Sequence, residues 1–262
     1  MSVSDVLLFD THSHFDVAAF DDDRDAALAR AKSAGVEWQL LPAIDRAGWQ
    51  HLADVCDAYP GLLPAYGLHP VYLPTHREDD LQALPEWIER HATYAIGEIG
   101  LDFFLPDLDV DLQTHYFETQ LRIARDHHLP VILHARRAVD AVLQTLRRIK
   151  PPGGIVHSFA GSEQQARQLI DMGFVLGIGG PVTYERAQRM HRVLKTLPRD
   201  GFVLETDSPD QPDSAWQGRR NEPARLVTVL AHVARIRDEA PEDIARYTTD
   251  TACKLFGISR AS

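Results

Sequence analysis

The sequence predicts an α/β protein, a (β/α)8 barrel with a metal site at the C-terminal ends of its strands. Two observations carry this prediction. Eight short apolar runs recur along the 262 residues, and each is followed by a segment with helical spacing. Histidines and carboxylates stand where most of these runs end. In a barrel of this kind the ends of the parallel strands meet at one rim, where active sites are built.

The apolar runs have the length and pattern of strands that are buried on both faces. Each is too short for a helix, and most are continuous rather than alternating, as expected for a parallel sheet. In chain order they cover residues 6–9, 37–41, 63–66, 94–97, 131–133, 154–156, 174–177 and 202–204. These eight runs are the predicted barrel strands.

The segments between the runs carry helical signals. Residues 25–34 set alanine and leucine against charged neighbours and are followed by Gly35, a typical helix stop. Residues 112–128 repeat apolar positions at threes and fours, and Ser162 with Gln165 resembles a capping box. This alternation without a low-complexity linker favours one domain over residues 1–262. An open, doubly wound sheet is the alternative, and the lack of a glycine-rich dinucleotide fingerprint weakens it.

Charge and composition restrict the partners. The formal net charge of −11 argues against a broad electrostatic grip on nucleic acid, although a partner that touches few phosphates stays compatible. Cys56 and Cys253 are expected to be small buried hydrophobes without a disulfide, which fits a reducing compartment. No signal-peptide pattern and no apolar run of membrane-spanning length is present. We therefore expect a cytoplasmic monomer that does not enter a membrane.

The predicted strand ends supply metal ligands. His12 and His14 follow the first run and point the same way, because side chains alternate along a strand. Later strand ends supply four more candidates, which are Glu98, His134, His157 and Asp207. Imidazoles with carboxylates suit zinc, manganese or nickel, whereas magnesium prefers oxygen ligands. Six candidates exceed the needs of one open catalytic ion, so we expect two divalent ions, and Glu98 offers two oxygens to bridge them.

The motifs at the strand ends resemble those of the TatD-type metal-dependent deoxyribonucleases, within the amidohydrolase-like barrel superfamily. In order they read DTHSH (10–14), GLHP (67–70), GEIGLD (97–102), PVILH (130–134), HSFAG (157–161) and LETDSP (204–209). They run from the first strand to the last, so the resemblance covers nearly the whole chain. Residues 177–180 and 217–223 also look like a YjjV-like branch. Two departures are Ala160, where Ser or Thr is usual, and Asp250, where Asn is common.

The resemblance implies a division of roles among these residues. One metal would be held by His12, His14 and Asp207, the other by His134 and His157, and Glu98 would bridge them. The residues that it implies for substrate contact are His69, Arg136, Arg220 and Asn221.

A chemical mechanism follows from two cations at one rim. Two divalent ions lower the pKa of a water and stabilise charge on a phosphate oxygen. Asp207 is the candidate general base, with a role as plain ligand as the alternative. His69 is expected to bind phosphate or to protonate the leaving oxygen, with a purely structural role as the alternative.

The reaction expected first is hydrolysis of phosphodiester bonds in DNA, from strand ends or on single strands. A cyclic amidohydrolase that cleaves C–N bonds is the second reading. Many such barrels bridge their metals through a carboxylated lysine on the fourth strand, and here that strand offers Glu98 and no nearby lysine. A metal-stabilised protein without catalysis is the third reading, and it would not need His69 and Arg136 beside the ligands. Aminoacyl-tRNA or a small phosphoester stays open as substrate.

Overall fold

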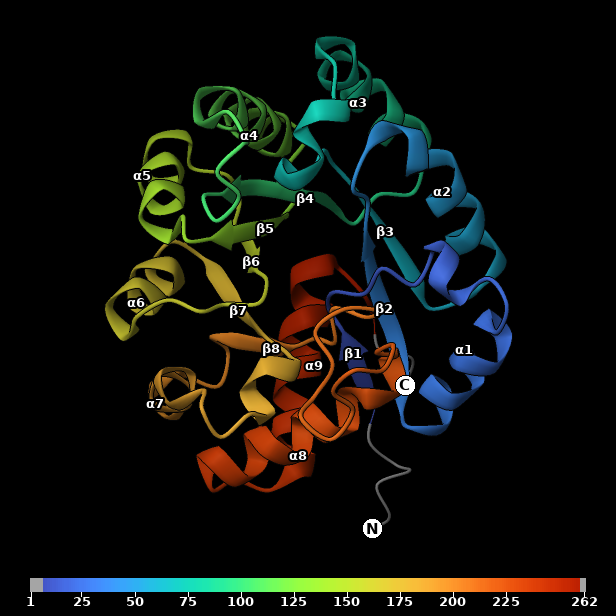
Figure 1. The fold of residues 1–262 in the computed structure, drawn as a ribbon, viewed down its shortest axis with the longest axis vertical. Coiled ribbons are helices and arrows are strands. Elements are labelled where there is room, and N and C mark those ends of the chain that lie inside the picture. Colours follow the sequence, from blue (N-terminus) through green and yellow to red (C-terminus); the bar gives the residue numbers. More distant parts are fainter. Residues whose placement is uncertain (1–6, 260–262) are drawn as a thin grey trace. The chain divides into compact units, whose positions relative to one another are not determined.

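The chain forms eight parallel strands that alternate with helices. The computed structural model describes residues 7–259. The strands are β1 (Leu8–Asp10), β2 (Val36–Pro42), β3 (Leu62–Tyr66), β4 (Ala95–Asp102), β5 (Val131–Arg136), β6 (Gly154–Val156), β7 (Phe174–Ile178) and β8 (Phe202–Leu204). They form one sheet in the order β1 to β8 (Figure 1). This order confirms the predicted (β/α)8 fold, the TIM barrel.

Helices follow the strands along the chain. They are α1 (Arg24–Ser33), α2 (Trp49–Ala58), α3 (Glu78–Arg90), α4 (Val110–Asp126), α5 (Val139–Ile149), α6 (Glu163–Asp171), α7 (Gln188–Thr196), α8 (Leu226–Arg237) and α9 (Pro241–Phe256). Short 3-10 turns, among them η4 (Pro70–Thr75) and η5 (Gly180–Thr183), come after β3 and β7. No helix within residues 7–259 is long and apolar enough to cross a membrane.

The described residues group into two compact units. Unit 1 takes in residues up to Leu41, Ser158–Ala166 and the chain from Leu176 onward, and unit 2 takes in Pro42–His157 and Arg167–Val175. Unit 2 holds β3, β4, β5 and β6, whose successive pairings are parallel. The expectation of a single domain over residues 1–262 stays a prediction.

In unit 1 the last strand lies beside the first. The Thr11 N–H donates to the Leu204 carbonyl at 3.1 Å, and the Asp207 N–H donates to the His12 carbonyl at 2.8 Å. Ser13 and Ser208 form a parallel bridge just beyond the strands. Pairing of the eighth strand with the first is what a closed barrel requires. It also places the end of β8 next to the end of β1.

Two of the predicted helix boundaries are confirmed by their hydrogen bonds and dihedral angles. The Ser162 N–H donates to Gln165 Oε1 at 2.8 Å, and the Gln165 N–H donates to Ser162 Oγ at 3.2 Å. This reciprocal pair is the capping box at the start of α6. Gly35, just beyond α1, has a φ of +87°, a left-handed conformation that glycine adopts readily.

Two strands extend at least three residues beyond the predicted runs. β4 continues to Asp102 and β5 to Arg136, so Glu98 and His134 lie within strands rather than after them. Gly100 permits this continuation, since a Cβ there would lie 2.0 Å from the His134 carbonyl oxygen of the neighbouring strand. Of the first predicted run, residue 6 lies outside the described part of the chain. Cys56 and Cys253 are buried, as predicted, and form no disulfide within the described residues.

Candidate metal centre

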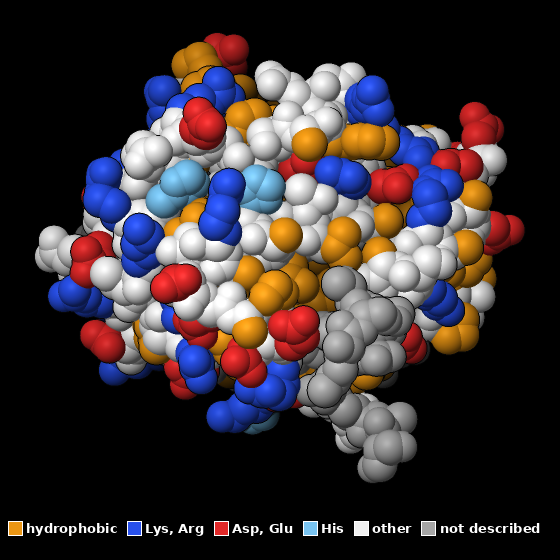
Figure 2. Space-filling model, turned by 90° about the horizontal axis from the view of Figure 1, so that it is seen from below, with side chains coloured by type: hydrophobic (Ala, Val, Ile, Leu, Met, Phe, Trp, Pro, Cys, Tyr) orange, Lys and Arg blue, Asp and Glu red, His pale blue; other side chains and the backbone are white. Residues whose placement is uncertain are grey.

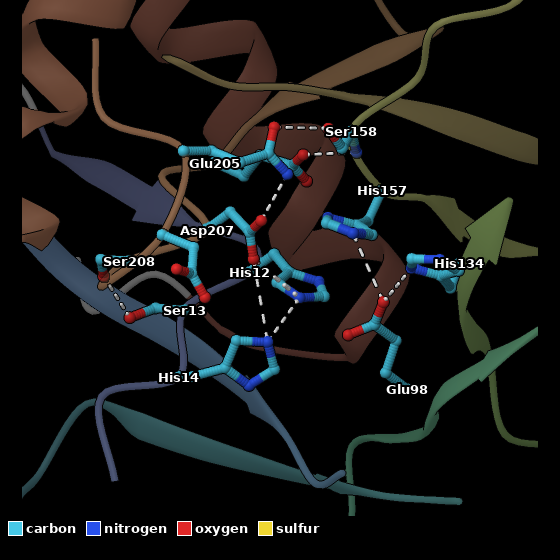
Figure 3. A network of polar contacts seen from close by, with 12 residues as sticks. His12, Ser13, His14, Glu98, His134, His157, Ser158, Glu205, Asp207 and Ser208 are labelled. Atoms are coloured by element: carbon cyan, nitrogen blue, oxygen red, sulfur yellow. Dashed lines mark hydrogen bonds and ion pairs between the residues drawn. The ribbon is translucent and has the colours of Figure 1, made fainter. Parts of the chain in front are cut away.

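Unit 1 brings three predicted ligands together. His12 and His14, which follow β1, turn their Nε2 atoms toward each other at 3.3 Å. Asp207, which follows β8, places Oδ1 3.5 Å from His12 Nε2 and 3.7 Å from His14 Nε2. Figure 3 shows these three side chains directed at a common point. We call this group the β1/β8 ligand set.

The spacing of the β1/β8 ligand set fits a divalent cation. With metal–ligand bonds of about 2.0–2.1 Å, the edges of a coordination tetrahedron measure about 3.3–3.4 Å. The three observed separations run from 3.3 to 3.7 Å. Two imidazoles and one carboxylate are also the donor types of open catalytic zinc sites. The residues therefore fit a metal with room for a further ligand.

The backbone at Asp207 is held in an unusual conformation. Its φ is +56°, in the left-handed region that non-glycine residues rarely adopt. The Gln211 side-chain amide donates to Asp207 Oδ2. Asn221 donates through Nδ2 to the carbonyls of Thr206 and Asp210, each at 2.8 Å. These bonds fix the strained turn that aims the Asp207 carboxylate, as is common at functional sites.

A second buried carboxylate supports this turn. Asp10 is fully buried and accepts hydrogen bonds from the Thr206 N–H at 2.8 Å and from the Thr206 hydroxyl. Burial raises the pKa of Asp10 to about 8, although these hydrogen bonds act in the opposite direction. Asp10 thereby ties the strand that precedes His12 to the residue that precedes Asp207.

Unit 2 gathers three histidines around one carboxylate. Glu98 Oε1 lies 3.0 Å from His134 Nδ1, 3.4 Å from His157 Nε2 and 3.1 Å from His69 Nε2. Glu98 is 1% exposed, and Figure 3 shows its carboxylate directed toward His134 and His157. Ligand atoms of His69, Glu98 and His134 lie within 4.8 Å of one another, a spacing that could hold a metal ion. We call Glu98, His134 and His157 the β4–β6 ligand set.

Asp102 orients His134. His134 Nε2 lies 2.9 Å from Asp102 Oδ2, so a proton on Nε2 leaves Nδ1 directed at Glu98 with its lone pair available. A carboxylate behind a ligating histidine is the usual supporting partner of a metal site. Burial works to lower the pKa of His134, but the carboxylates of Asp102 and Glu98 outweigh it and raise that pKa.

His69 is arranged as a hydrogen-bond donor rather than as a ligand. Its Nδ1 accepts the Val71 N–H at 3.1 Å, which requires that atom to be unprotonated. A neutral ring then carries its proton on Nε2, the atom that lies 3.1 Å from Glu98 Oε1. His76 lies behind it, with Nε2 2.9 Å from the His69 carbonyl oxygen. His76 itself is half-buried.

The residues predicted for substrate contact differ in their surroundings. Arg136 is exposed at the end of β5. Arg220 forms a two-pronged ion pair with Asp23 and stacks over the Phe20 ring with its Cζ 4.5 Å from the centroid. Asn221 is 2% exposed and bonds the backbone on either side of Asp207. Substrate contact by Arg220 and Asn221 stays a prediction, since the structure gives both residues internal partners.

Three supporting residues were not singled out from the sequence, namely Asp10, Asp102 and Gln211. Asp10 and Asp102 stand inside the recognised motifs, and their carboxylate chemistry was the available signal. Glu205 is fully buried and its Oε1 accepts the Ser158 N–H at 2.6 Å. Gly177 makes room for it, because a Cβ there would lie 2.1 Å from Glu205 Oε2. Gln211 gave no signal, since nothing in its local sequence ties it to Asp207.

Known proteins match this chain over nearly its whole length. The family described as TatD related DNase matches residues 9–257. Escherichia coli K12 has a relative named uncharacterized metal-dependent hydrolase YjjV, which is 37% identical over 95% of this chain and 97% of its own. The 3'-5' ssDNA/RNA exonuclease TatD of Citrobacter rodentium is 33% identical over 97% of this chain and 100% of its own.

A crystal structure extends the match to three dimensions. The structure of Escherichia coli YjjV has a TM-score of 0.93 with this chain and covers 96% of it, while this chain covers 98% of YjjV. This likeness confirms the barrel prediction. The family match, the relatives and the two ligand sets agree, so this chain belongs to the TatD-related DNase family and is a metal-dependent hydrolase with histidine and carboxylate groups suited to metal binding.

Proposed function

We propose that this protein hydrolyses phosphodiester bonds at the ends of single-stranded nucleic acid, with DNA as the first substrate. In this proposal His12, His14 and Asp207 hold one divalent ion, His134 and His157 hold a second, and Glu98 bridges the two. Zinc, manganese and nickel suit these donors best, and magnesium suits them less.

The spacing of the β1/β8 ligand set carries this proposal. Three donors that follow β1 and β8 lie 3.3–3.7 Å apart, the spacing of ligands around one divalent cation. The β4–β6 ligand set adds two imidazoles around Glu98. Bound divalent cations would supply Lewis acidity and a water of lowered pKa. All remaining steps of the reaction fall to side chains of this chain.

Asp207 is the proposed acceptor of the proton from the attacking water. Its Oδ1 faces the two histidines, while the Gln211 amide holds Oδ2 and so fixes the plane of the carboxylate. A base must lie within hydrogen-bond reach of its proton, and a fixed orientation keeps it there through the reaction.

His69 is the proposed donor to the leaving oxygen. The tautomer that its Nδ1 contact with Val71 requires leaves the proton on Nε2, directed into the group around Glu98. A hydrogen bond from this neutral imidazole would stabilise the negative charge that builds on the leaving oxygen, while the ring keeps its only proton. The burial of His69, 7% exposed, keeps bulk water from replacing it as donor.

The substrate class rests on the family and on the distribution of charge. The relative from Citrobacter rodentium is named as an exonuclease of single-stranded DNA and RNA. On the face shown in Figure 2, basic and acidic side chains are interspersed and no continuous basic stripe crosses it. With a net charge of −11, attraction must come from bound cations and a few arginines. That arrangement favours contact with few phosphates near a strand end.

The alternative is hydrolysis of a cyclic amide, an aminoacyl ester or a small phosphoester. Metal-dependent barrels that cleave cyclic amides often bridge their ions through a carboxylated lysine on the fourth strand, and β4 holds no lysine. The deciding experiment loads metal-free protein with one divalent metal at a time. Each form is assayed against single-stranded DNA with free ends, the same DNA as a closed circle, RNA, small phosphoesters and cyclic amides. Cleavage of cyclic amides without cleavage of nucleic acid would overturn the proposal, as would equal cutting of the closed circle.

A further inference from the structure

Two guanidinium groups lie over one exposed aromatic ring where β4 and β5 end. The Cζ atom of Arg136 is 3.7 Å from the centroid of the Phe104 ring, and that of Arg137 is 4.7 Å from it. The phenylalanine is 40% exposed, and both arginines are exposed as well. We call Arg136, Phe104 and Arg137 the Arg–Phe–Arg group. An exposed ring that contacts two cations contributes little to folding stability, so a functional role explains this arrangement better.

No carboxylate in the described part of the chain pairs with either guanidinium. Among residues 7–259, neither Arg136 nor Arg137 takes part in an ion pair or a hydrogen bond through its side chain. Other arginines of unit 2 do pair with carboxylates, among them Arg46, Arg90, Arg122, Arg125 and Arg148. Two cations thus lie over one ring with no carboxylate among these residues to offset their charge. The ring offsets only part of their mutual repulsion, and a bound anion would offset the rest.

The backbone holds this group in place. Arg137 has a φ of +55°, a left-handed conformation that is uncommon for arginine and that brings consecutive side chains to one ring. Asp102 Oδ1 accepts the N–H groups of Phe104 and Leu105 at 2.9 and 3.2 Å. The other oxygen of the same carboxylate bonds His134. One side chain therefore positions both the ring and a predicted metal ligand.

The strand register places Arg136 two residues beyond His134, toward the C-terminal end of β5. In the β4–β5 ladder Gly100 pairs with His134 and Asp102 pairs with Arg136. His134 and Arg136 are two residues apart and project from the same side of β5, since side chains alternate. Two residues of a parallel strand span about 6.6 Å. If a substrate phosphate lay at His134, the next phosphate of the nucleic-acid strand would thus be within reach of the guanidiniums.

We propose that Arg136 and Arg137, stacked on Phe104, form a phosphate clamp for the phosphate next to the scissile one. This inference rests on the proposed phosphodiesterase function and narrows it. A planar guanidinium binds two phosphate oxygens at once, and stacking on the ring keeps its fork oriented before the substrate arrives. The clamp selects oligonucleotides over phosphoesters that carry a single phosphate. Phe104 is a positioning residue, because it acts through the arginines.

The test measures binding without catalysis. Metal-free protein is titrated with a short fluorescein-labelled oligothymidylate across a range of salt concentrations, and fluorescence anisotropy gives the affinity. On a single strand each phosphate contact contributes about −0.7 to the slope of log affinity against log salt, and the clamp supplies one such contact without bound metal. Replacing both arginines, Arg136→Gln with Arg137→Gln, should weaken binding about tenfold or more and make the slope shallower by about 0.7 for each phosphate lost.

Two further variants separate the clamp from general charge. Arg90→Gln removes a charge from the exposed end of α3 and should leave affinity and slope unchanged. Arg136→Lys with Arg137→Lys keeps both charges but loses the planar forks, so we expect an intermediate loss. The clamp is overturned if the double glutamine variant binds with the affinity and slope of Arg90→Gln.

An activity assay with metal-loaded enzyme distinguishes an error in the clamp proposal from an error in the proposed function. The measured quantity is the ratio of kcat/KM for an oligonucleotide to kcat/KM for a p-nitrophenyl phosphodiester. The clamp predicts that this ratio falls about tenfold in the double glutamine variant. An unchanged ratio in an enzyme that does cut oligonucleotides contradicts the clamp alone. A wild type that binds the oligonucleotide through these arginines but cuts no phosphodiester contradicts the proposed function alone.

Discussion

The single asparagine of the chain, Asn221, offers a quantitative test of how the β1/β8 ligand set is held. Its buried amide donates to the carbonyls of Thr206 and Asp210, the residues on either side of the turn that carries Asp207. Asn221→Ala leaves both carbonyl oxygens without this donor. Thr206 is buried whereas Asp210 is exposed, and one orphaned buried group costs about 1–3 kcal/mol, so the free energy of unfolding should fall by about 1–3 kcal/mol.

This loss should be visible in two measurements on the same variant. For a domain of this size, 1 kcal/mol corresponds to about 2–4 °C in Tm, so metal-free Asn221→Ala should melt about 2–12 °C below the wild type. Loosening of the support behind a ligand typically lowers metal affinity by about 10–100-fold, which a competitive zinc titration would detect. We expect both effects together, because one side chain fixes the turn.

A matched control removes an amide from the surface. Gln168→Ala deletes a side chain that bonds exposed Arg147, and it should change stability by less than about 0.5 kcal/mol. If Asn221→Ala melts and binds zinc as this control does, the amide does not hold the turn and the reasoning from its hydrogen bonds is wrong. A drop in Tm with unchanged zinc affinity would show that the turn keeps its geometry without Asn221.

The remaining predictions concern the ligand sets. Glu98→Gln removes one anionic oxygen and should lower metal content and activity by orders of magnitude while the barrel stays folded. Glu89→Gln, at an exposed position of α3, is the control. Full metal content by elemental analysis together with normal turnover in Glu98→Gln would refute the bridging role. Asp207→Asn should remove the fall in rate at acidic pH together with most of the rate, whereas recovery of the rate in excess metal would make Asp207 a ligand only. Asp102→Asn should weaken zinc binding about 10–100-fold through His134, and an affinity equal to that of the exposed neighbour variant Asp107→Asn would contradict this.

The strands could be predicted because a strand that is buried on both faces has a continuous run of apolar residues. Apolar runs such as 154–156 and 202–204 coincide with β6 and β8 as the structure has them. β4 was predicted too short because Glu98 and Asp102 break the apolar pattern. In the structure both are buried within the strand, where hydrogen bonds and histidines compensate their charge. Polar functional residues therefore interrupt the apolar pattern by which their strand would be recognised.

The residue types of the predicted ligands and their positions at strand ends could be read from the sequence. The residues that support these ligands could not. His12, His14 and Asp207 stand in motifs, and the structure brings them together. Gln211 acts on Asp207 through a turn whose left-handed residues have no marker in the sequence. Arg137 was overlooked because its role depends on a dihedral angle that places it beside Phe104. Such contacts arise from backbone geometry, which residue type alone does not encode.

The pairing of the last strand with the first has a consequence for biosynthesis. Ser13 and Ser208, which meet beside the β1/β8 ligand set, are 195 residues apart in the chain. A ribosome must therefore make most of the polypeptide before His12 and His14 can meet Asp207. The β4–β6 ligand set is complete once residue 157 has emerged. The predicted ligands around Glu98 are therefore all synthesised well before Asp207.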